Sequence, residues 1–454
     1  MKRILFFFLL CSFATHAQYK ISGKMSPALE SDWVILYRIE GAKQVFVNNT
    51  SVSVDSISVN NKKKAVGSFS FTLPESAEPG YYRATYRLEG ATFVDFFFNK
   101  ENVSFVFNPD YPNETVVFAE STENQYYKEY INSISPYQQT LDSLQVAAIR
   151  NPNADVSKTY QTSKKQLDSI HNVFVKATEN MYVAPFIKAT VRNNSDTIFK
   201  EVDAYMSHIK KSFFDAIDFT DQTLINSSFI TDRILDYIFY LNYSEDPKIQ
   251  RELYKKSTKE VLDKITDLDY KKQIIEFLGD QFQASKNVFL MDYLLDNFYK
   301  KLPSNLQDQN YIVEKVSAMA GEVGRKAPNF AWQENGAPQS LHKLNDGQQY
   351  ILVFYSTTCS HCLREIPELY SFMQSKPNTK VIAFALENDS YGWESYTKTL
   401  SGWHHVLGLN KWQNKTARTY QVNATPSYFI LDKNKTIIAK PDAIKDVKAF
   451  LNGN

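Results

Sequence analysis

The sequence predicts a multidomain α+β protein. An N-terminal antiparallel β sandwich-like domain precedes a central all-α helical region and a C-terminal α/β domain. Three observations predict this order. Short aromatic and β-branched runs fill residues 18–120, apolar positions recur at three- and four-residue intervals over 121–320, and strands alternate with helices from 322 to 454. The remaining segment, residues 1–17, reads as a signal peptide.

The first domain is expected to be built from short strands with turns between them. Aromatic and β-branched residues dominate four runs, and turn pairs such as Pro79-Gly80 separate them. The runs are WVILY (33–37), SFSFTL (68–73), YYRATYRL (81–88) and VSFVF (103–107). Because no cluster of catalytic residue types stands out there, we expect a packing or docking module.

The central region reads as helices. In FITDRILDYIFYLNY (229–243) the apolar spacing places one set of side chains on a single helix side, namely Ile230, Ile234, Tyr237, Ile238 and Leu241. Five prolines are expected to mark helix breaks: Pro136, Pro152, Pro185, Pro247 and Pro303. His171 and His208 stand alone among these helices and are expected to be surface or core histidines rather than metal ligands.

The C-terminal domain is predicted to be compact, with mixed strand pairing. A strand is expected at 350–355, followed by two cysteines, a helix and a second strand at 380–387. A hairpin-like pair at 427–432 and 436–440 precedes a final helix from Asp442.

The N-terminus predicts export. Lys2 and Arg3 precede an apolar stretch from Ile4 to Cys11, and the small residues of Thr15-His16-Ala17 predict cleavage after Ala17. We expect the mature protein in the periplasm or cell envelope, with no membrane-spanning segment. Lipid anchoring at Cys11 is disfavoured because Leu10, rather than a small residue, precedes it.

Composition and cysteine content narrow the function. A net charge of +1 gives no electrostatic argument for nucleic acid. After cleavage only Cys359 and Cys362 remain, and the loop that they would close is too short to be an effective structural staple. A zinc site would need two further ligands. His404-His405 would have to supply both, and adjacent histidines rarely face one ion, so no metal is predicted.

The spacing of the two cysteines predicts a working dithiol. Cys359 falls at a helix N-terminus, where free N–H groups and the helix dipole favour a thiolate. Cys362 lies one turn inside on the same face and is placed to resolve a mixed disulfide. The His361 imidazole is expected to tune the Cys359 thiolate. If buried, Glu365 would take the Cys362 proton; the alternative is a solvated helix carboxylate.

Residues 322–454 resemble the thioredoxin superfamily, specifically the TlpA/ResA-like envelope thiol–disulfide oxidoreductases. The match rests on GRKAPNF, ILVFY, Cys359-Ser360-His361-Cys362, LREIPEL, VIAFALE and YQVNATPSYFILDKNKTI. The resemblance implies a thioredoxin fold and a cis bond between Thr425 and Pro426 beside the dithiol. It also implies that the Thr425 backbone pairs with a substrate peptide and that Glu365 is an acid–base partner. No cofactor is predicted.

Three departures from that family concern the dithiol. Thr358 replaces a tryptophan before the first cysteine, and His361 stands where many members have proline. Val353 occupies the position where thioredoxins bury an aspartate, so Glu365 is the only nearby carboxylate expected.

The predicted function is an exported thiol–disulfide oxidoreductase that acts on protein disulfides or dithiols as a reductant, with a membrane redox donor as a candidate partner. His361 argues for the oxidising direction. The alternative is an envelope binding or scaffold protein whose thioredoxin-like domain is a redox sensor or docking module. The upstream domains are similar to modules that precede thioredoxin domains in bacterial envelope proteins, and no activity carries over from them.

Overall fold

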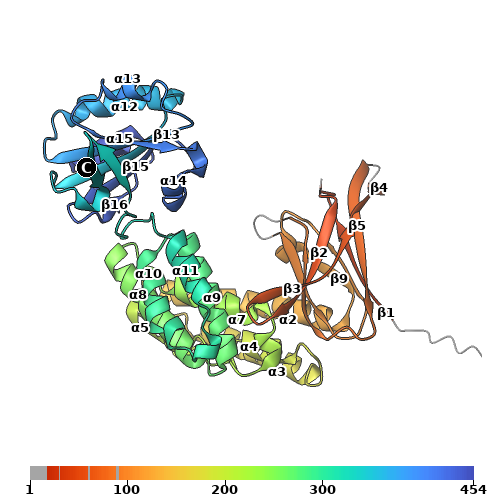
Figure 1. Cartoon of the computed structure of the whole chain (residues 1–454). Coiled ribbons are helices and arrows are strands. Elements are labelled where there is room, and N and C mark those ends of the chain that lie inside the picture. Colours follow the sequence, from red (N-terminus) through yellow and green to blue (C-terminus); the bar gives the residue numbers. More distant parts are fainter. Residues whose placement is uncertain (1–17, 30, 60–61, 88–91, 454) are drawn as a thin grey trace, which may run out of the picture. The chain divides into compact units, whose positions relative to one another are not determined.

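The computed structural model describes residues 18–29, 31–59, 62–87 and 92–453 (Figure 1). The predicted signal peptide, its cleavage after Ala17 and Cys11, the disfavoured site of lipid anchoring, lie outside these residues. The chain forms two compact units that divide between Ile274 and Ile275, within one helix. The predicted boundaries of three domains stay a prediction.

The first unit begins with two β-sheets. One sheet has the strand order β4-β5-β1-β8-β9 and the other β3-β2-β6-β7. The strands of the first are β1 (Gln18–Met25), β4 (Ser53–Val59), β5 (Lys62–Pro74), β8 (Val103–Phe107) and β9 (Val117–Glu120). Those of the second are β2 (Trp33–Glu40), β3 (Lys43–Ser51), β6 (Gly80–Thr85) and β7 (Phe93–Phe98).

The two sheets share one apolar core, which makes them a sandwich. Alternation in β8 buries Val103, Phe105 and Phe107, because successive side chains of a strand point to opposite faces. The Phe105 ring lies 5.7 Å from the ring of Phe96 in the other sheet. The predicted sandwich-like fold is therefore confirmed. One pair, β1 with β8, is parallel, whereas the other strand pairs described in these two sheets are antiparallel.

Helices fill the rest of the first unit, as the apolar spacing predicted. They are α1 (Pro112–Thr115), α2 (Thr122–Arg150), α3 (Ser157–Ala177), α4 (Ala184–Thr190), α5 (Val202–Ser212), α6 (Gln222–Ile225), α7 (Ser228–Leu235) and α8 (Pro247–Lys264). Helix α9 (Leu268–Ala284) crosses into the second unit.

The expectation that Pro136 breaks a helix was wrong, because this proline lies inside α2. Its missing N–H leaves a helical carbonyl without its usual donor. The buried side chains of Tyr130, Ile134 and Leu141 hold both halves of α2 against the protein. Tertiary packing of this kind outweighs the local cost of one proline. Pro185 and Pro247 do lie at helix starts.

The stretch 229–243 is not a single α-helix. After α7 the chain continues as a π-helix, η1 (Asp236–Leu241). Ile230, Ile234 and Ile238 are fully buried, as the pattern predicted, while Leu241 is only half-buried. A π-helix inserts an extra residue per turn, which the three-and-four spacing does not reveal.

The second unit continues after α9 with helices that precede its strands. They are α10 (Val288–Asn297), the short 3-10 helices η2 (Tyr299–Lys301) and η3 (Ser304–Leu306), and α11 (Gln309–Ala318). The strands that follow are β10 (Ala331–Glu334), β11 (Ala337–Ser340), β12 (Gln349–Tyr355), β13 (Thr379–Glu387), β14 (His404–Leu409), β15 (Ser427–Asp432) and β16 (Ile437–Ala439). Between them lie η4 (Leu341–Lys343), α12 (Ser360–Met373), α13 (Trp393–Thr397), η5 (Lys411–Gln413) and α14 (Lys415–Thr419), and α15 (Ile444–Asn452) ends the unit.

A five-stranded mixed sheet with the order β14-β13-β12-β15-β16 organises this unit (Figure 1). Strands β12, β13 and β14 are parallel, whereas β15 and β16 are antiparallel to their neighbours. Every residue of β12 from Tyr350 to Tyr355 is fully buried, so both faces of the sheet are covered. One face packs on α12 and α15 through Ile366 and Ile444. The central strand therefore ends at a fixed, buried point.

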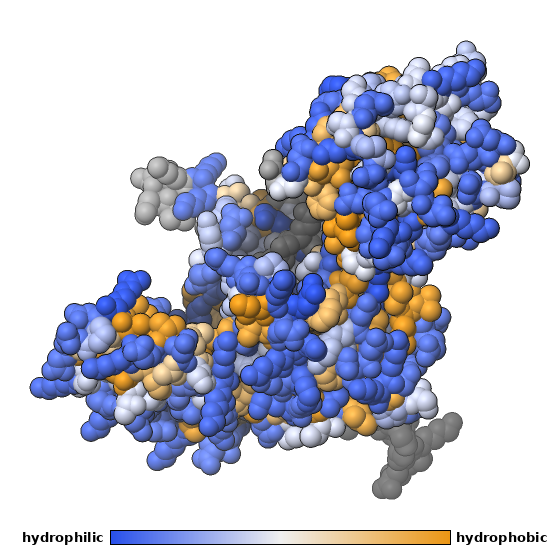
Figure 2. All heavy atoms as spheres, turned by 90° about the vertical axis from the view of Figure 1, so that its left-hand side faces the viewer, coloured by the Kyte–Doolittle hydropathy of each residue, from blue (hydrophilic) through white to orange (hydrophobic). Residues whose placement is uncertain are grey.

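Hydrophilic side chains predominate on the face drawn in Figure 2, with hydrophobic ones gathered in patches. Within the described ranges, no helix combines the length and the apolar character that crossing a membrane requires.

Candidate active site

The two cysteines lie at the junction between β12 and α12. The strand ends at Tyr355, a three-residue loop follows, and Cys359 is the N-cap of α12 with an extended backbone. Its sulfur accepts a hydrogen bond from the Cys362 N–H at 3.4 Å. Cys359 is partly exposed, Cys362 is fully buried, and both are free thiols. One sulfur therefore meets solvent and the other does not.

The surroundings of the two sulfurs shift the pKa values of the two thiols in opposite directions. Burial opposes ionisation of Cys359. Hydrogen bonds from the Cys362 thiol and from the N–H groups of Cys362 and His361 outweigh it and lower the pKa of Cys359. Burial, reinforced by the hydrogen bond with Cys359, raises the pKa of Cys362 to about 12. The nucleophile in a thiol exchange is the thiolate, so Cys359 is the group able to attack.

This difference predicts a selective pH profile for alkylation. The thiolate fraction of Cys359 grows as pH rises through its pKa, which lies below the ordinary value of a cysteine thiol. We expect iodoacetamide to modify Cys359 with a midpoint below that value and to leave Cys362 unmodified up to pH ~10. Peptide mass spectrometry between pH 5 and 10 measures both. In the urea-denatured chain the two cysteines should react alike, and equal rates in the native chain would contradict the assignment.

The loop before β15 meets the exposed cysteine. The Thr425–Pro426 peptide bond is cis, as the family resemblance implied. The Cys359 thiol donates a hydrogen bond to the Thr425 carbonyl at 3.2 Å. Both loop residues are half-buried. A backbone carbonyl is thus held beside the attacking sulfur, at the open end of the site.

Glu365 lies one turn after Cys362 with its side chain 14% exposed. Its carboxylate accepts hydrogen bonds from the Tyr428 hydroxyl at 3.0 Å and from the Ile444 N–H at 3.2 Å. Burial, followed by the nearby Glu365 charge, raises the pKa of Tyr428, so the hydroxyl stays a donor. The charge of an ionised Cys362 sulfur also raises the pKa of the Tyr428 hydroxyl. Glu365 is therefore held in place and is not a freely solvated helix carboxylate.

His361 and Thr358 are both exposed. The hydrogen bond from His361 that favours the Cys359 thiolate comes from its backbone N–H, which any residue except proline would supply. Among the described residues, no bond joins its imidazole to the Cys359 sulfur. The predicted tuning by the imidazole stays a prediction.

Glu387, at the end of β13, is a site residue that the sequence reasoning missed, and the expectation of a single nearby carboxylate was wrong. It is 4% exposed. It accepts hydrogen bonds from the Ser356 hydroxyl at 3.2 Å, the Thr357 hydroxyl at 2.9 Å and the Thr357 N–H. An acidic residue closing a buried parallel strand was a usable signal, because the carboxyl ends of parallel strands meet at one edge.

We expect Glu387→Ala to slow alkylation of Cys359 by about tenfold at pH 7, since it leaves buried loop donors without an acceptor and loosens the segment before Cys359. Glu387→Gln keeps one acceptor oxygen and should lie between the two. Glu394→Ala, on the surface of α13, is the matched control. Rates by mass spectrometry and amide exchange at Thr357 measure the effect. An alanine variant that reacts like the wild type would rule out a positioning role.

The remaining histidines have ordinary partners. His404 and His405 follow one another in β14 and point to opposite faces. The His404 imidazole contacts the carboxylates of Glu334 and Asp346, and His405 contacts the Leu400 carbonyl. His171 contacts the Tyr130 hydroxyl at 2.8 Å. In the part of the chain that the structure describes, no cluster of three His, Cys, Asp or Glu side chains is arranged to hold a metal ion.

Comparison with known proteins places the C-terminal part of the chain. Residues 323–440 match the model of the AhpC/TSA family. No curated protein matches the chain significantly. Among solved structures, a domain of a "possible thiol-disulfide isomerase" from Cytophaga hutchinsonii is 31% identical, with 29% of this chain and 91% of that chain covered and a TM-score of 0.26.

Two further structures come from Bacteroides. The thioredoxin domain of a thiol-disulfide oxidoreductase from Bacteroides vulgatus is 20% identical, covering 29% of this chain and 96% of its own, with a TM-score of 0.26. A thioredoxin-like protein from Bacteroides caccae is 18% identical, covering 58% and 100%, with a TM-score of 0.27. Because the family match coincides in the sequence with the observed mixed sheet, the C-terminal part of the chain is a thioredoxin-superfamily domain, which confirms the resemblance found in its sequence.

Proposed function

We propose that the C-terminal domain exchanges the Cys359–Cys362 dithiol with disulfides of protein substrates and acts as a reductant. The observation that carries the proposal is the contrast between the two sulfurs. A partly exposed thiol with a lowered pKa caps a helix, and a fully buried thiol with a raised pKa lies one turn further on. Attack and resolution need these two different thiols.

The first step is attack by the Cys359 thiolate on one sulfur of a substrate disulfide. A mixed disulfide forms, the substrate S–S bond breaks, and the first substrate thiolate leaves and takes a proton from water. The Thr425 carbonyl lies beside the attacking sulfur. The substrate backbone would pair there in an extended form, replacing the contact from the thiol.

In the second step Cys362 resolves the mixed disulfide. Its raised pKa means that the proton must be removed as the sulfur attacks. Glu365 is the proposed proton acceptor. The Tyr428 hydroxyl holds it by a hydrogen bond, and the charges of both Glu365 and Cys362 raise the pKa of that hydroxyl. Cys362 then bonds to Cys359 and the second substrate thiolate leaves. The substrate gains two electrons and the pair becomes a disulfide, which an external dithiol, supplied by a membrane donor in the cell, reduces again.

The test is reduction of insulin disulfides by the full chain with dithiothreitol as the electron source. We expect the wild-type chain to accelerate insulin precipitation over dithiothreitol alone. Absence of acceleration, together with no oxidation of a reduced dithiol peptide, would favour the alternative of a binding or scaffold protein with a redox-sensing domain.

We also propose that the protein acts outside the cytoplasm, in the periplasm or cell envelope. Support comes from the basic residues Lys2 and Arg3, the apolar stretch after them and the small residues before Gln18. N-terminal sequencing of the protein from its native host tests this. A chain that begins at Gln18 agrees with export, and a retained Met1 contradicts it.

A further inference from the structure

A pocket of about 440 Å³ lies in the helical part of the first unit, away from the dithiol in sequence and in structural unit. The loop after α4, helix α5 and the π-helix η1 form its walls. Its volume falls within the range of about 300–1,000 Å³ that is usual for small-molecule sites.

Helix α5 supplies an apolar wall that packs into no closed core. Tyr205, Met206 and Ile209 lie on one side of this helix and line the pocket. The helix has no buried residue at all, although its apolar residues share one face. Phe213 and Leu241 extend the wall and are also half-buried. An amphipathic helix that keeps its apolar side on a cavity leaves room for an apolar ligand.

Arg233, from α7, supplies a guanidinium to the same pocket. Its guanidinium lies 5.2 Å from the Phe213 ring and 5.9 Å from the Phe229 ring. Its Nε is buried and has no hydrogen-bond partner. The Asp236 carboxylate lies 3.6 Å from Nη1, which is an ion pair without a close hydrogen bond. A buried donor without a partner is costly. The Arg233 side chain is 24% exposed and lines the pocket, so the open part of its guanidinium is able to meet a ligand oxygen.

The π-helix places further groups at the same wall. In η1 the residues Asp236, Tyr240 and Leu241 lie four and five positions apart, which one turn of a π-helix brings together. Such turns occur often at functional sites. Tyr240 is 78% exposed and stands at the rim.

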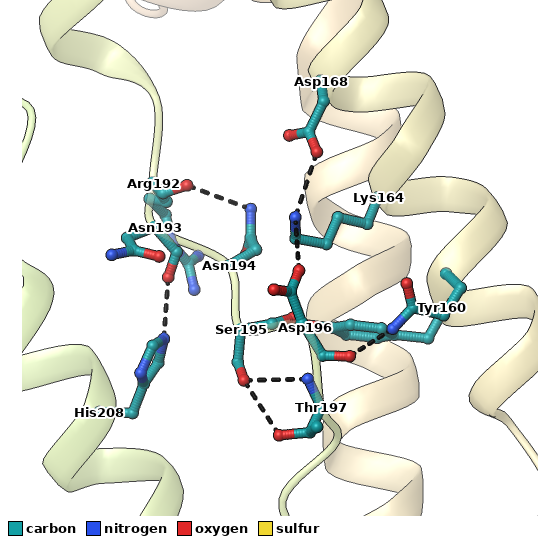
Figure 3. A network of polar contacts seen from close by, with 11 residues as sticks. Tyr160, Lys164, Asp168, Arg192, Asn193, Asn194, Ser195, Asp196, Thr197 and His208 are labelled. Carbon is teal, nitrogen blue, oxygen red and sulfur yellow. Dashed lines mark hydrogen bonds and ion pairs between the residues drawn. The ribbon is translucent and has the colours of Figure 1, made fainter.

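Arg192 is a second arginine at this pocket, and the loop that carries it is fixed in place (Figure 3). His208 of α5 donates from Nε2 to the Asn193 carbonyl at 3.0 Å, and Asn194 donates to the Arg192 carbonyl at 3.4 Å. Arg192 itself donates from Nη1 to Asp142 at 2.9 Å. This wall is thus held before any ligand arrives, so little ordering cost falls on binding.

We propose that this pocket binds a small organic monoanion, a carboxylate carried on an apolar or aromatic body. The carboxylate meets the guanidinium of Arg233, and the body lies against Tyr205, Met206 and Ile209. A guanidinium fork matches a carboxylate in geometry and charge. Asp236 disfavours a ligand with two negative charges, because its own charge lies beside the same guanidinium. The inference stands apart from the proposed redox function and does not rest on it.

The experiment is saturation-transfer NMR and calorimetric titration of the full chain with 4-phenylbutyrate as the probe. Its neutral analogue 4-phenylbutyramide is the matched ligand. We expect saturable binding of the carboxylate and binding of the amide weaker by about tenfold or more, since only the carboxylate forms charge-assisted bonds. No saturable binding of phenylbutyrate, or equal binding of the amide, would overturn the proposal.

Variants separate the site from general effects. Arg233→Met should weaken phenylbutyrate binding by about tenfold to a hundredfold. Arg150→Met, at the end of α2 and outside this pocket, should leave it unchanged. Because Arg233→Met removes packing on two rings, Met206→Trp provides a second variant, which fills the pocket and keeps both arginines. Binding that survives Met206→Trp at wild-type strength would contradict the location. Cys359→Ser should bind as the wild type, which keeps failure of the redox function distinct.

Discussion

Replacing Cys359 with serine is expected to reduce insulin-disulfide reduction to the rate of dithiothreitol alone. A serine hydroxyl does not ionise at neutral pH, so the attacking thiolate is lost while the N-cap oxygen still accepts the Cys362 N–H. The fold should be unchanged, because Cys359 is partly exposed. Turnover of insulin measures the effect.

Cys362→Ser should fail at a different step. Cys359 still attacks, but the buried resolving thiol is missing, so a mixed disulfide with the substrate persists. Non-reducing gel electrophoresis with a disulfide-bonded peptide should show the adduct for Cys362→Ser and none for Cys359→Ser. An adduct formed equally by both variants would contradict the assignment of distinct roles, and an adduct formed by Cys359→Ser alone would reverse those roles.

The largest expected loss of stability follows Phe354→Ala. Phe354 is fully buried in β12, and its ring lies 4.9 Å from Phe384, 5.3 Å from Tyr420 and 5.8 Å from Phe429. Truncating such a side chain costs about 3–5 kcal/mol, from lost transfer energy and a residual cavity. The second unit should be destabilised while the sandwich of the first keeps its stability.

Hydrogen–deuterium exchange separates the two units, which a single unfolding curve does not. Protection of the β12 and β13 amides should fall in Phe354→Ala, and protection of β1 and β5 should not. Leu363→Ala is the control, because that side chain is 49% exposed and should cost well under ~1 kcal/mol. Unchanged β12 protection in Phe354→Ala would show that this aromatic cluster does not stabilise the sheet whose central strand leads to the dithiol.

Local pattern was enough for the elements that carry the chemistry. The apolar run ending at Tyr355 and the helix period after Cys362 place a strand and a helix on either side of the dithiol, and the structure has both. Short aromatic runs likewise predicted β2, β5, β6 and β8. The strands that were not predicted include β3, which is largely exposed and lacks a buried face to leave a pattern.

Contacts between segments that are far apart in the sequence could not be predicted from it. Glu387 reaches Thr357 across 30 positions only because β13 pairs in parallel with β12. Tyr428 reaches Glu365 across 63 positions through the pairing of β15 with β12. The parallel pairing of β1 with β8 is of the same kind. Register of this sort depends on the whole core, and single-segment periodicity carries no information about it.

The central claim is that Cys359 and Cys362 form one reversible two-electron couple. The most direct measurement is equilibration of the full chain with dithiothreitol and glutathione buffers, followed by alkylation and mass analysis of the two cysteines. We predict a single transition in which both thiols are lost together, at about −270 mV, the value of a reductant such as thioredoxin. A transition at about −120 mV would contradict the reducing direction. If no intramolecular disulfide forms at any ratio of thiol to disulfide in the buffer, the proposed redox couple itself is contradicted.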